Sequence, residues 1–325
     1  MKEIITLGEI IVEIMAKEKD QSFKHAGEFL GPYPSGAPAI FINQVAKMGV
    51  PAAILGCVGK DDFGFMCTDR LQSNRVSTRL IHQHEDYPTG TAFVTYKKNG
   101  NRDFIFNIRH SAAAHLQMSN QAQEALKQCS LFHVMGSSIF STEIIPTLRE
   151  AIHLVKVNGG QISFDPNVRK ELLNDPTLMC FFKEILTCTD VFLPSGDELL
   201  SITETETQDQ ALSQLWSQGV SEVILKKGAS GCDYFSPDQH IYSPPYKVCE
   251  IDATGAGDTF GATFLASRMK GHSSARSLEL ANAAGALAVS VWGPMEGASS
   301  QAELEHFIHH KNTDMEAEKC LKPIC

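Results

Sequence analysis

The feature that most constrains the fold is the alternation of short β-branched runs with helical stretches over most of the chain. Such an alternation predicts a mostly parallel sheet covered by helices on both faces. Ligands of such sheets bind beyond the carboxyl ends of the strands. The predicted strands cover residues 4–15, 52–58, 131–135, 161–165, 190–193 and 222–226. The predicted helices cover residues 39–48, 63–73, 142–157, 178–186, 208–218 and 275–291.

One region interrupts this alternation. Residues 89–108, TGTAFVTYKKNGNRDFIFNI, alternate along two strands that meet at Asn99-Gly100, a strong signal for a β-hairpin. Residues 9–14 and 24–29 supply further strand material. Together these segments predict a small sheet that projects from the main one as a lid. A hairpin at the edge of the main sheet is the alternative.

The composition limits the classes of function. A formal net charge of −10 argues against a nucleic-acid or anionic-membrane surface. No apolar run approaches the ~18 residues of a membrane span, and the N-terminus alternates like a strand and carries acids, so we expect a cytoplasmic protein. Nine cysteines without a CxxC pair or a Cys/His cluster favour reduced thiols.

The stretch DATGAGD, residues 252–258, leads into a predicted helix. Gly255 and Gly257 lack a Cβ, so the amides around Ala256 can approach a phosphate oxygen closely. Asp258 falls in the first helical turn, where amide donors and the helix dipole favour its ionised form. An ionised carboxylate there can accept a proton from a substrate hydroxyl. A tight turn with a capping Asp is the plainer alternative.

Two more stretches accompany this motif: PSGAPAIFINQVAKMG at 34–49 and LGCVGKDDFG at 55–64. With them, the sequence resembles the ribokinase-type (PfkB) family of carbohydrate kinases over nearly the whole chain. The resemblance implies a three-layer α/β/α sandwich with a mostly parallel central sheet (ribokinase-like) and a small β-sheet lid over the sugar. It implies one kinase domain over residues 1–325, with lid segments at about 9–35 and 85–110. Its substrates would be ATP and a sugar, with Mg²⁺ as the cofactor.

The resemblance also implies roles for residues on the phosphate side. Asp258 matches the family's catalytic base, and the amides of Gly255, Ala256 and Gly257 match its anion hole. Glu198 matches an acid near the magnesium.

Further residues correspond to the nucleotide side of the family's site. Ser195 stands near the magnesium and phosphates, where Asn is usual, and Lys226 and Gly228 belong to a segment near the nucleotide. Asn282 resembles a contact on the adenine side, with a tight helix-packing face as the alternative. Asp252 and Thr254 correspond to residues that bind a monovalent cation in some relatives, which leaves such a cation open here.

On the sugar side, the resemblance implies contacts from Glu13, Gly36, Arg109 and Arg169. Glu13 stands where ribokinases and fructokinases have Asp and 2-keto-3-deoxygluconate kinases often have Glu. Arg169 closes FDPNVR, and an arginine there pairs with a sugar-acid carboxylate in that last subgroup. The implied acceptor is a primary hydroxyl of a ketose or keto-sugar acid, of the 2-keto-3-deoxygluconate or the tagatose and fructose type.

Two other functions stay open. A nucleoside kinase of the same fold would need an aromatic clamp, for which Phe104, Phe106 or Tyr33 is available. A catalytically inactive sugar-sensing protein would have no need of Asp258. The exposed edge of the predicted hairpin would also allow a homodimer that pairs through the lid.

Overall fold

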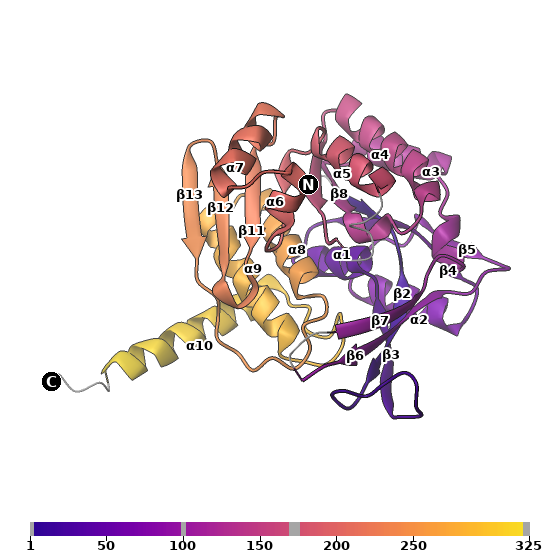
Figure 1. The fold of residues 1–325 in the computed structure, drawn as a ribbon, viewed down its shortest axis with the longest axis horizontal. Coiled ribbons are helices and arrows are strands. Elements are labelled where there is room, and N and C mark those ends of the chain that lie inside the picture. Colours follow the sequence, from indigo (N-terminus) through magenta and orange to yellow (C-terminus); the bar gives the residue numbers. More distant parts are fainter. Residues whose placement is uncertain (1–2, 99–101, 169–175, 321–325) are drawn as a thin grey trace.

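The computed structural model describes residues 3–98, 102–168 and 176–320, and for residues 312–320 the backbone alone. Within this part of the chain, nine strands form one large sheet with helices on both faces, and a smaller sheet projects from it (Figure 1). The order of the large sheet is β13 (Gln239–Ser243), β12 (Cys232–Ser236), β11 (Glu222–Lys226), β10 (Val191–Phe192), β9 (Gln161–Asp165), β8 (Leu131–Met135), β1 (Ile4–Leu7), β4 (Ala52–Gly59) and β5 (Ile81–His84).

The strands from β11 to β5 in this order run parallel, whereas β12 and β13 pair antiparallel at one edge. Parallel strands between two helical layers are buried on both faces. Strand β4 follows this rule, because every one of its residues is buried. The carboxyl ends of β1, β8, β9, β10 and β11 therefore meet at one edge of the sheet.

The helices form two layers. One layer packs on one core of the sheet and contains α1 (Ala37–Lys47), α2 (Asp62–Ser73), α8 (Ala256–Met269), α9 (Ser274–Val289) and α10 (Gln301–Cys320). The other packs on the opposite core and contains α3 (Asn120–Gln128), α4 (Ile145–Val157), α5 (Pro176–Leu186), α6 (Glu198–Thr203) and α7 (Gln208–Ser217). The three-layer α/β/α sandwich is thus confirmed. No helix in the described part of the chain is long and apolar enough to cross a membrane.

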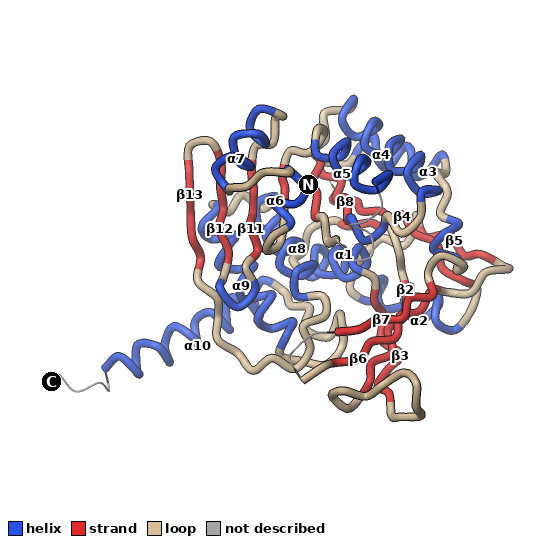
Figure 2. The backbone as a smooth tube through the Cα atoms, in the orientation of Figure 1, coloured by secondary structure: helices blue, strands red, loops and turns tan. Residues whose placement is uncertain are grey.

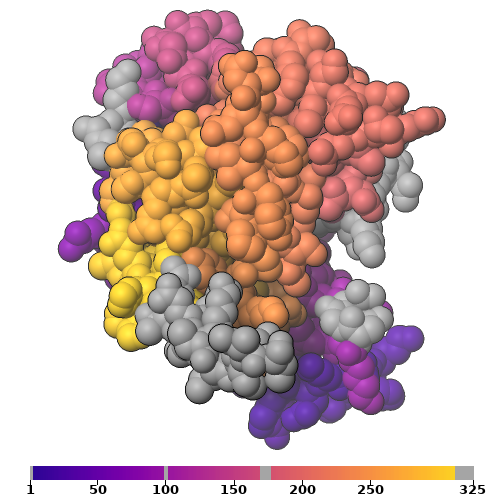
Figure 3. All heavy atoms as spheres, turned by 90° about the vertical axis from the view of Figure 1, so that its left-hand side faces the viewer, coloured from indigo at the N-terminus to yellow at the C-terminus, as the bar shows by residue number. Residues whose placement is uncertain are grey.

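The small sheet has the order β3 (Phe29–Ser35), β2 (Ile11–Ala16), β6 (Gly90–Tyr96) and β7 (Arg102–Asn107). The predicted hairpin is confirmed, since β6 and β7 pair antiparallel from Thr91 opposite Asn107 to Tyr96 opposite Arg102. Its turn at Asn99-Gly100 lies outside the described residues. We call this sheet the lid sheet. Figure 2 shows it beside helix α2, and in the space-filling view of Figure 3 indigo and purple N-terminal residues lie below the orange part of the chain.

Two predicted strands needed correction. The strand predicted over residues 4–15 is two strands in different sheets, because the chain crosses from β1 to β2 at Gly8 and Glu9. A Cβ at Gly8 would lie 2.0 Å from the Ser138 hydroxyl oxygen, so only glycine fits this crossing. The strand predicted over residues 24–29 begins instead at Phe29, where pairing with β2 starts opposite Ala16.

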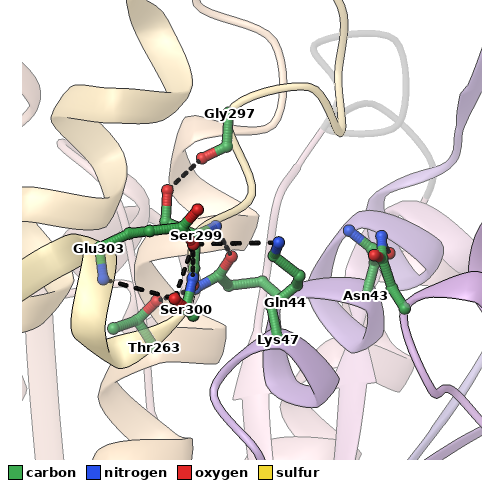
Figure 4. Close-up of polar contacts among 9 residues, drawn as sticks. Asn43, Gln44, Lys47, Thr263, Gly297, Ser299, Ser300 and Glu303 are labelled. Carbon is green, nitrogen blue, oxygen red and sulfur yellow. Dashed lines mark hydrogen bonds and ion pairs between the residues drawn. The ribbon is translucent and has the colours of Figure 1, made fainter.

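The buried side chain of Gln44 joins α1 to α8 and to the segment that precedes α10 (Figure 4). Its Nε2 atom, on α1, donates to Thr263 Oγ1 of α8 at 2.9 Å and to the Ser299 carbonyl at 2.9 Å. The Ser299 amide donates back to Gln44 Oε1 at 2.9 Å. These bonds hold α8 against α1 and fix the chain that leads to α10. Neighbouring Asn43 points elsewhere and accepts from Asn74 Nδ2.

We expect Gln44→Ala to lower the free energy of unfolding by about 2–4 kcal/mol, because the buried Ser299 amide and carbonyl and the Thr263 hydroxyl lose a partner. Urea denaturation of the purified protein measures this loss. Gln128→Ala, at an exposed position at the end of α3, is the control and should change stability by less than about 0.5 kcal/mol. Equal losses in the two variants would contradict the role of Gln44.

Candidate active site

A buried ion pair lies at the carboxyl edge of the large sheet. Asp165 is the last residue of β9 and Lys226 the last of β11. Lys226 Nζ contacts Asp165 Oδ2, and their side chains are 10% and 2% exposed. Burial raises the pKa of Asp165, against the pull of the Lys226 ammonium group. The pair brings a positive charge into the place where strand ends and the helix α8 meet.

Helix α8 begins beside this pair with a cluster of unpaired amides. Its N-cap, Gly255, has φ +77, and a Cβ there would lie 2.7 Å from the Pro294 carbonyl oxygen. No described residue accepts a hydrogen bond from the amides of Ala256, Gly257 or Asp258. A Cβ on Gly257 would lie 3.8 Å from Lys226 Nζ, so these amides and the ammonium group face one space. The arrangement suits an anion.

Asp258 is buried in the first turn of α8, and its protonation differs from the sequence prediction. Burial, Asp165 and Glu9 raise the pKa of Asp258 to about 8, although Lys226 and Arg102 lower it. The expectation that helix amides keep this group ionised is therefore wrong for the protein alone. No side chain caps the helix, and the only polar contact is a long one of 3.4 Å from Asn167 Nδ2 to Asp258 Oδ1, among the described residues. Desolvation outweighs the dipole.

Glu198, the first residue of α6, holds the adjoining loops through backbone amides. Its Oε1 atom accepts from the Val168 amide at 2.8 Å and its Oε2 atom from the Ser195 amide at 2.7 Å. Burial and nearby Asp165 raise the pKa of Glu198. Ser195 itself bridges to Lys226 between the ends of β10 and β11. Two carboxylates, Asp165 and Glu198, thus lie side by side at the strand ends.

These carboxylates fit magnesium in one particular way. No group of three or more Cys, His, Asp or Glu residues in the described ranges could hold a metal ion by itself. Mg²⁺ is usually bound by one or two carboxylates, waters and substrate phosphates. Asp165 and Glu198 match that donor set, because they offer hard oxygen atoms next to the anion-compatible amides of α8.

Glu13 lies on the lid sheet in a buried position. Its Oε2 atom accepts from the Ser35 hydroxyl at 2.9 Å, whereas its buried Oε1 atom has no hydrogen-bond partner among the described residues. Burial raises the pKa of Glu13 to about 7, although the Ser35 hydrogen bond lowers it. Gly36 follows at the N-cap of α1 with φ +106, and a Cβ there would lie 2.3 Å from the Glu9 carbonyl oxygen.

Two lid residues contact the loop that precedes α8. The Tyr96 hydroxyl donates to Asp252 Oδ1 at 3.0 Å, and Arg102 Nη1 donates to Thr254 Oγ1 at 2.9 Å. Asp252 also accepts from the amides of Thr254 at 3.0 Å and Gly293 at 3.2 Å. In Asp252 and Thr254, where the resemblance left a monovalent cation open, the side-chain oxygens therefore accept hydrogen bonds from the lid and from nearby amides.

Arg109 lines a cavity beside the lid sheet. This cavity of about 790 Å³ is also lined by Phe104, Phe106, His110 and Phe140, and neither Asp258 nor Glu13 belongs to the lining. The rings of Phe104 and Phe106 stack on each other with centroids 5.1 Å apart. Arg169, the other predicted arginine, lies outside the described residues.

Gly228 and Asn282 lie beyond the end of β11. Gly228 has φ +53, and a Cβ there would meet nothing within 4 Å, so a ligand can approach its backbone. Asn282 Nδ2 donates to the Ser243 hydroxyl at 2.9 Å and to the Pro244 carbonyl at 3.0 Å. These bonds tie α9 to the end of β13, which supports the packing alternative for Asn282.

The sequence reasoning did not assign a role to several residues of this site. Asp165 ends a predicted strand, and that position could have identified it. Glu9 accepts from the hydroxyls of Ser137 and Ser138 at 3.0 and 2.8 Å, between the two sheets. In the sequence, Tyr96 and Arg102 were recognisable only as residues of the hairpin. Their contacts join segments more than 150 residues apart, which no local pattern shows.

The fold and site together define a phosphate-handling α/β enzyme, with an anion-compatible helix N-terminus at the strand ends and a lid sheet beside it. The family model for pfkB family carbohydrate kinases matches residues 1–301. The chain therefore belongs to the PfkB family of carbohydrate kinases and is a sugar phosphotransferase.

Individual relatives agree with this assignment. Fructokinase-1 of Zea mays is 29% identical over 316 residues, which cover 94% of this chain and 97% of the relative. An E. coli protein with the provisional name ribokinase II, crystallised with ATP and Mg²⁺, is 45% identical with a TM-score of 0.90, over 95% of this chain and 100% of that one. A Vibrio cholerae fructokinase double mutant with bound fructose, ADP and potassium is 26% identical with a TM-score of 0.82, over 95% and 98%.

We expect Asp258→Asn to stabilise the protein increasingly as the pH rises. An acid whose pKa is raised on folding binds its proton more tightly in the folded state, so wild-type stability falls between about pH 4 and about pH 8. Asparagine has no proton to lose. Urea denaturation at about pH 5 and about pH 8 measures the difference between variant and wild type.

The exposed Asp238→Asn is the matched control for this prediction, and its stability difference from wild type should not change with pH. A pH-independent difference for Asp258→Asn as well would show that the Asp258 carboxyl group does not hold its proton as described.

Proposed function

We propose that the protein transfers the γ-phosphate of ATP to a primary hydroxyl of a ketose or keto-sugar acid, of the fructose, tagatose or 2-keto-3-deoxygluconate type. Membership of the PfkB family supports the reaction class. The fructokinases among its relatives support a ketose, and the E. coli relative that was crystallised with ATP and Mg²⁺ supports both of these as ligands.

The observation that carries the proposal is the set of unpaired amides at the start of α8, beside Asp258 and Lys226. The amides of Gly255, Ala256 and Gly257 bind the oxygens of the transferred phosphoryl group, and Lys226 adds a positive charge. Asp258 accepts the proton of the attacking hydroxyl. A general base works best with a pKa near the operating pH, so the raised pKa of Asp258, about 8, suits this role.

Magnesium, when bound with ATP, neutralises phosphate charge and orients the phosphates for in-line transfer. Glu198 and Asp165 would hold it through their carboxylates. Ser195, beyond the end of β10, pairs with Lys226 through an isolated backbone bridge and donates its amide to Glu198. Gly228 leaves its backbone open to the nucleotide, and Asn282 shapes that side by fastening α9 to β13.

On the sugar side, Glu13 accepts a hydrogen bond from a sugar hydroxyl. Its buried Oε1 atom has no partner among the described residues, and a sugar hydroxyl that donates to it would remove that cost. Gly36 lets the start of α1 approach the same side. Arg109, in the cavity beside the lid sheet, is available to a carboxylate at the far end of a keto-sugar acid. Arg169 keeps the role that the resemblance implies.

The nucleoside alternative is less favoured by the aromatic residues. A base clamped between two rings needs them about 7 Å apart, since each aromatic layer takes about 3.5 Å. Phe104 and Phe106 stack on each other at 5.1 Å instead. A purely sugar-sensing protein would have no use for unpaired amides next to a buried acid.

Replacement of the base tests the mechanism. We expect Asp258→Asn to lower kcat by about 10³-fold or more with the best sugar, because an asparagine side chain cannot take the hydroxyl proton. ATP affinity, measured by calorimetry, should change by less than about threefold. Asp238→Asn is the control and should keep wild-type kcat. Substantial activity in Asp258→Asn would rule out the assigned base.

The acceptor is tested by a coupled ADP assay with 2-keto-3-deoxygluconate, tagatose, fructose, ribose and adenosine. We expect the highest kcat/KM with one of the first three. If it is the keto-sugar acid, Arg109→Ala should lower kcat/KM for this acid by about 10²-fold and leave fructose nearly unchanged, because only the acid carries a carboxylate. The highest kcat/KM with adenosine would contradict the proposal.

A further inference from the structure

Two residues at the end of the lid hairpin reach the loop that begins α8. Tyr96 is the last residue of β6, Arg102 is the first of β7, and they lie opposite each other in the hairpin. The Tyr96 ring packs edge-on against Trp292 at 5.5 Å and its hydroxyl donates to buried Asp252. Arg102 donates to the hydroxyl of Thr254, next to Gly255. The lid sheet is thus bonded directly to the loop that carries the unpaired amides.

These bonds involve the side-chain oxygens that the resemblance connects with a monovalent cation. The two oxygens of Asp252 accept from Tyr96 and from the amides of Thr254 and Gly293. The Thr254 hydroxyl accepts from Arg102 at 2.9 Å. A metal ion coordinated by that hydroxyl would lie close to the guanidinium group bonded to the same oxygen, and like charges at such separations repel.

Arg102 also brings its charge near the acids of the site. It lowers the pKa of both Glu13 and Asp258, which places the guanidinium group within electrostatic reach of each. A cation near the α8 loop would act on the same two carboxylates and on the same loop. The protein therefore already carries a positive group where a monovalent ion would act.

We propose that Tyr96 and Arg102 are positioning residues that hold the Asp252–Thr254 loop in place of a monovalent cation, so that phosphoryl transfer depends on these lid contacts and not on potassium. The inference rests on the proposed function of the α8 site. It differs from what is seen in the Vibrio cholerae fructokinase, whose crystals contained potassium. Because the contacts come from the lid sheet, the amides of α8 are aligned only when the lid sheet lies against the loop.

Variants of the two residues test the positioning role. We expect Tyr96→Phe, which keeps the ring against Trp292, and Arg102→Ala each to lower kcat about tenfold or more, the worth of one lost hydrogen bond in the transition state. The KM for ATP should stay within about threefold. Lys97→Ala is the control, because Lys97 lies in the same hairpin but forms only an exposed ion pair with Asp103. A loss of thermal stability with unchanged kcat would overturn the proposal.

Replacement of potassium tests the second part of the proposal, that phosphoryl transfer does not depend on this ion. With potassium exchanged for tetramethylammonium at constant ionic strength, wild-type kcat should change by less than about twofold. Activation by potassium of about fivefold or more would overturn the proposal.

A second readout does not depend on activity. An ion bound only by the folded protein raises the midpoint of thermal unfolding. We therefore expect equal midpoints for the wild type in the two salts, and a rise specific to potassium would contradict the inference. This measurement also separates the two proposals, because the loss of the Asp258 mechanism would leave it unaffected.

Discussion

The buried ion pair between Lys226 and Asp165 is the interaction on which the site depends. The parallel strands β9 and β11 end at one edge of the sheet, and their last residues, Asp165 and Lys226, contact each other there. Asp165, Glu198 and Asp258 would repel one another there, and each is also penalised by burial. Lys226 lowers the pKa of all three carboxyl groups. Its positive charge therefore reduces the repulsion among them at this edge of the sheet.

The second constraint is the attachment of the lid sheet to the main body. The chain crosses between the two sheets at Gly8 and Glu9, and the lid hairpin returns to the α8 loop through Tyr96 and Arg102. Gln44 holds the same helix from the other side through Thr263 and Ser299. Helix α8 is thus bonded to α1 along its length, and the loop before it is bonded to the lid sheet. These bonds link the sugar-side residues of the lid to the phosphate-side residues of α8.

Most of the sandwich could be predicted from local pattern. The strands at 131–135, 161–165 and 222–226 and the antiparallel hairpin lie where the alternation places them, because buried parallel strands and amphipathic helices have strong periodic signals. The lid strand predicted over residues 9–14 is confirmed as β2, but the sequence did not show where the main-sheet strand predicted over residues 4–15 ends, because β1 and β2 form one alternating run. Strand β3 of the lid sheet was predicted too early in the chain, because its start is set by pairing with β2.

The sequence by itself determined the fold class, the glycine turn before α8 and the position of Asp258 in the first helical turn, because these follow from local periodicity and from backbone freedom at Gly255. It also carried the likeness to carbohydrate kinases. Only the tertiary structure decided the raised pKa of Asp258 and the bonding of Asp252 and Thr254 to the lid. Those properties arise from burial and from charges far apart in the chain, and no local pattern of residues encodes the distance between them.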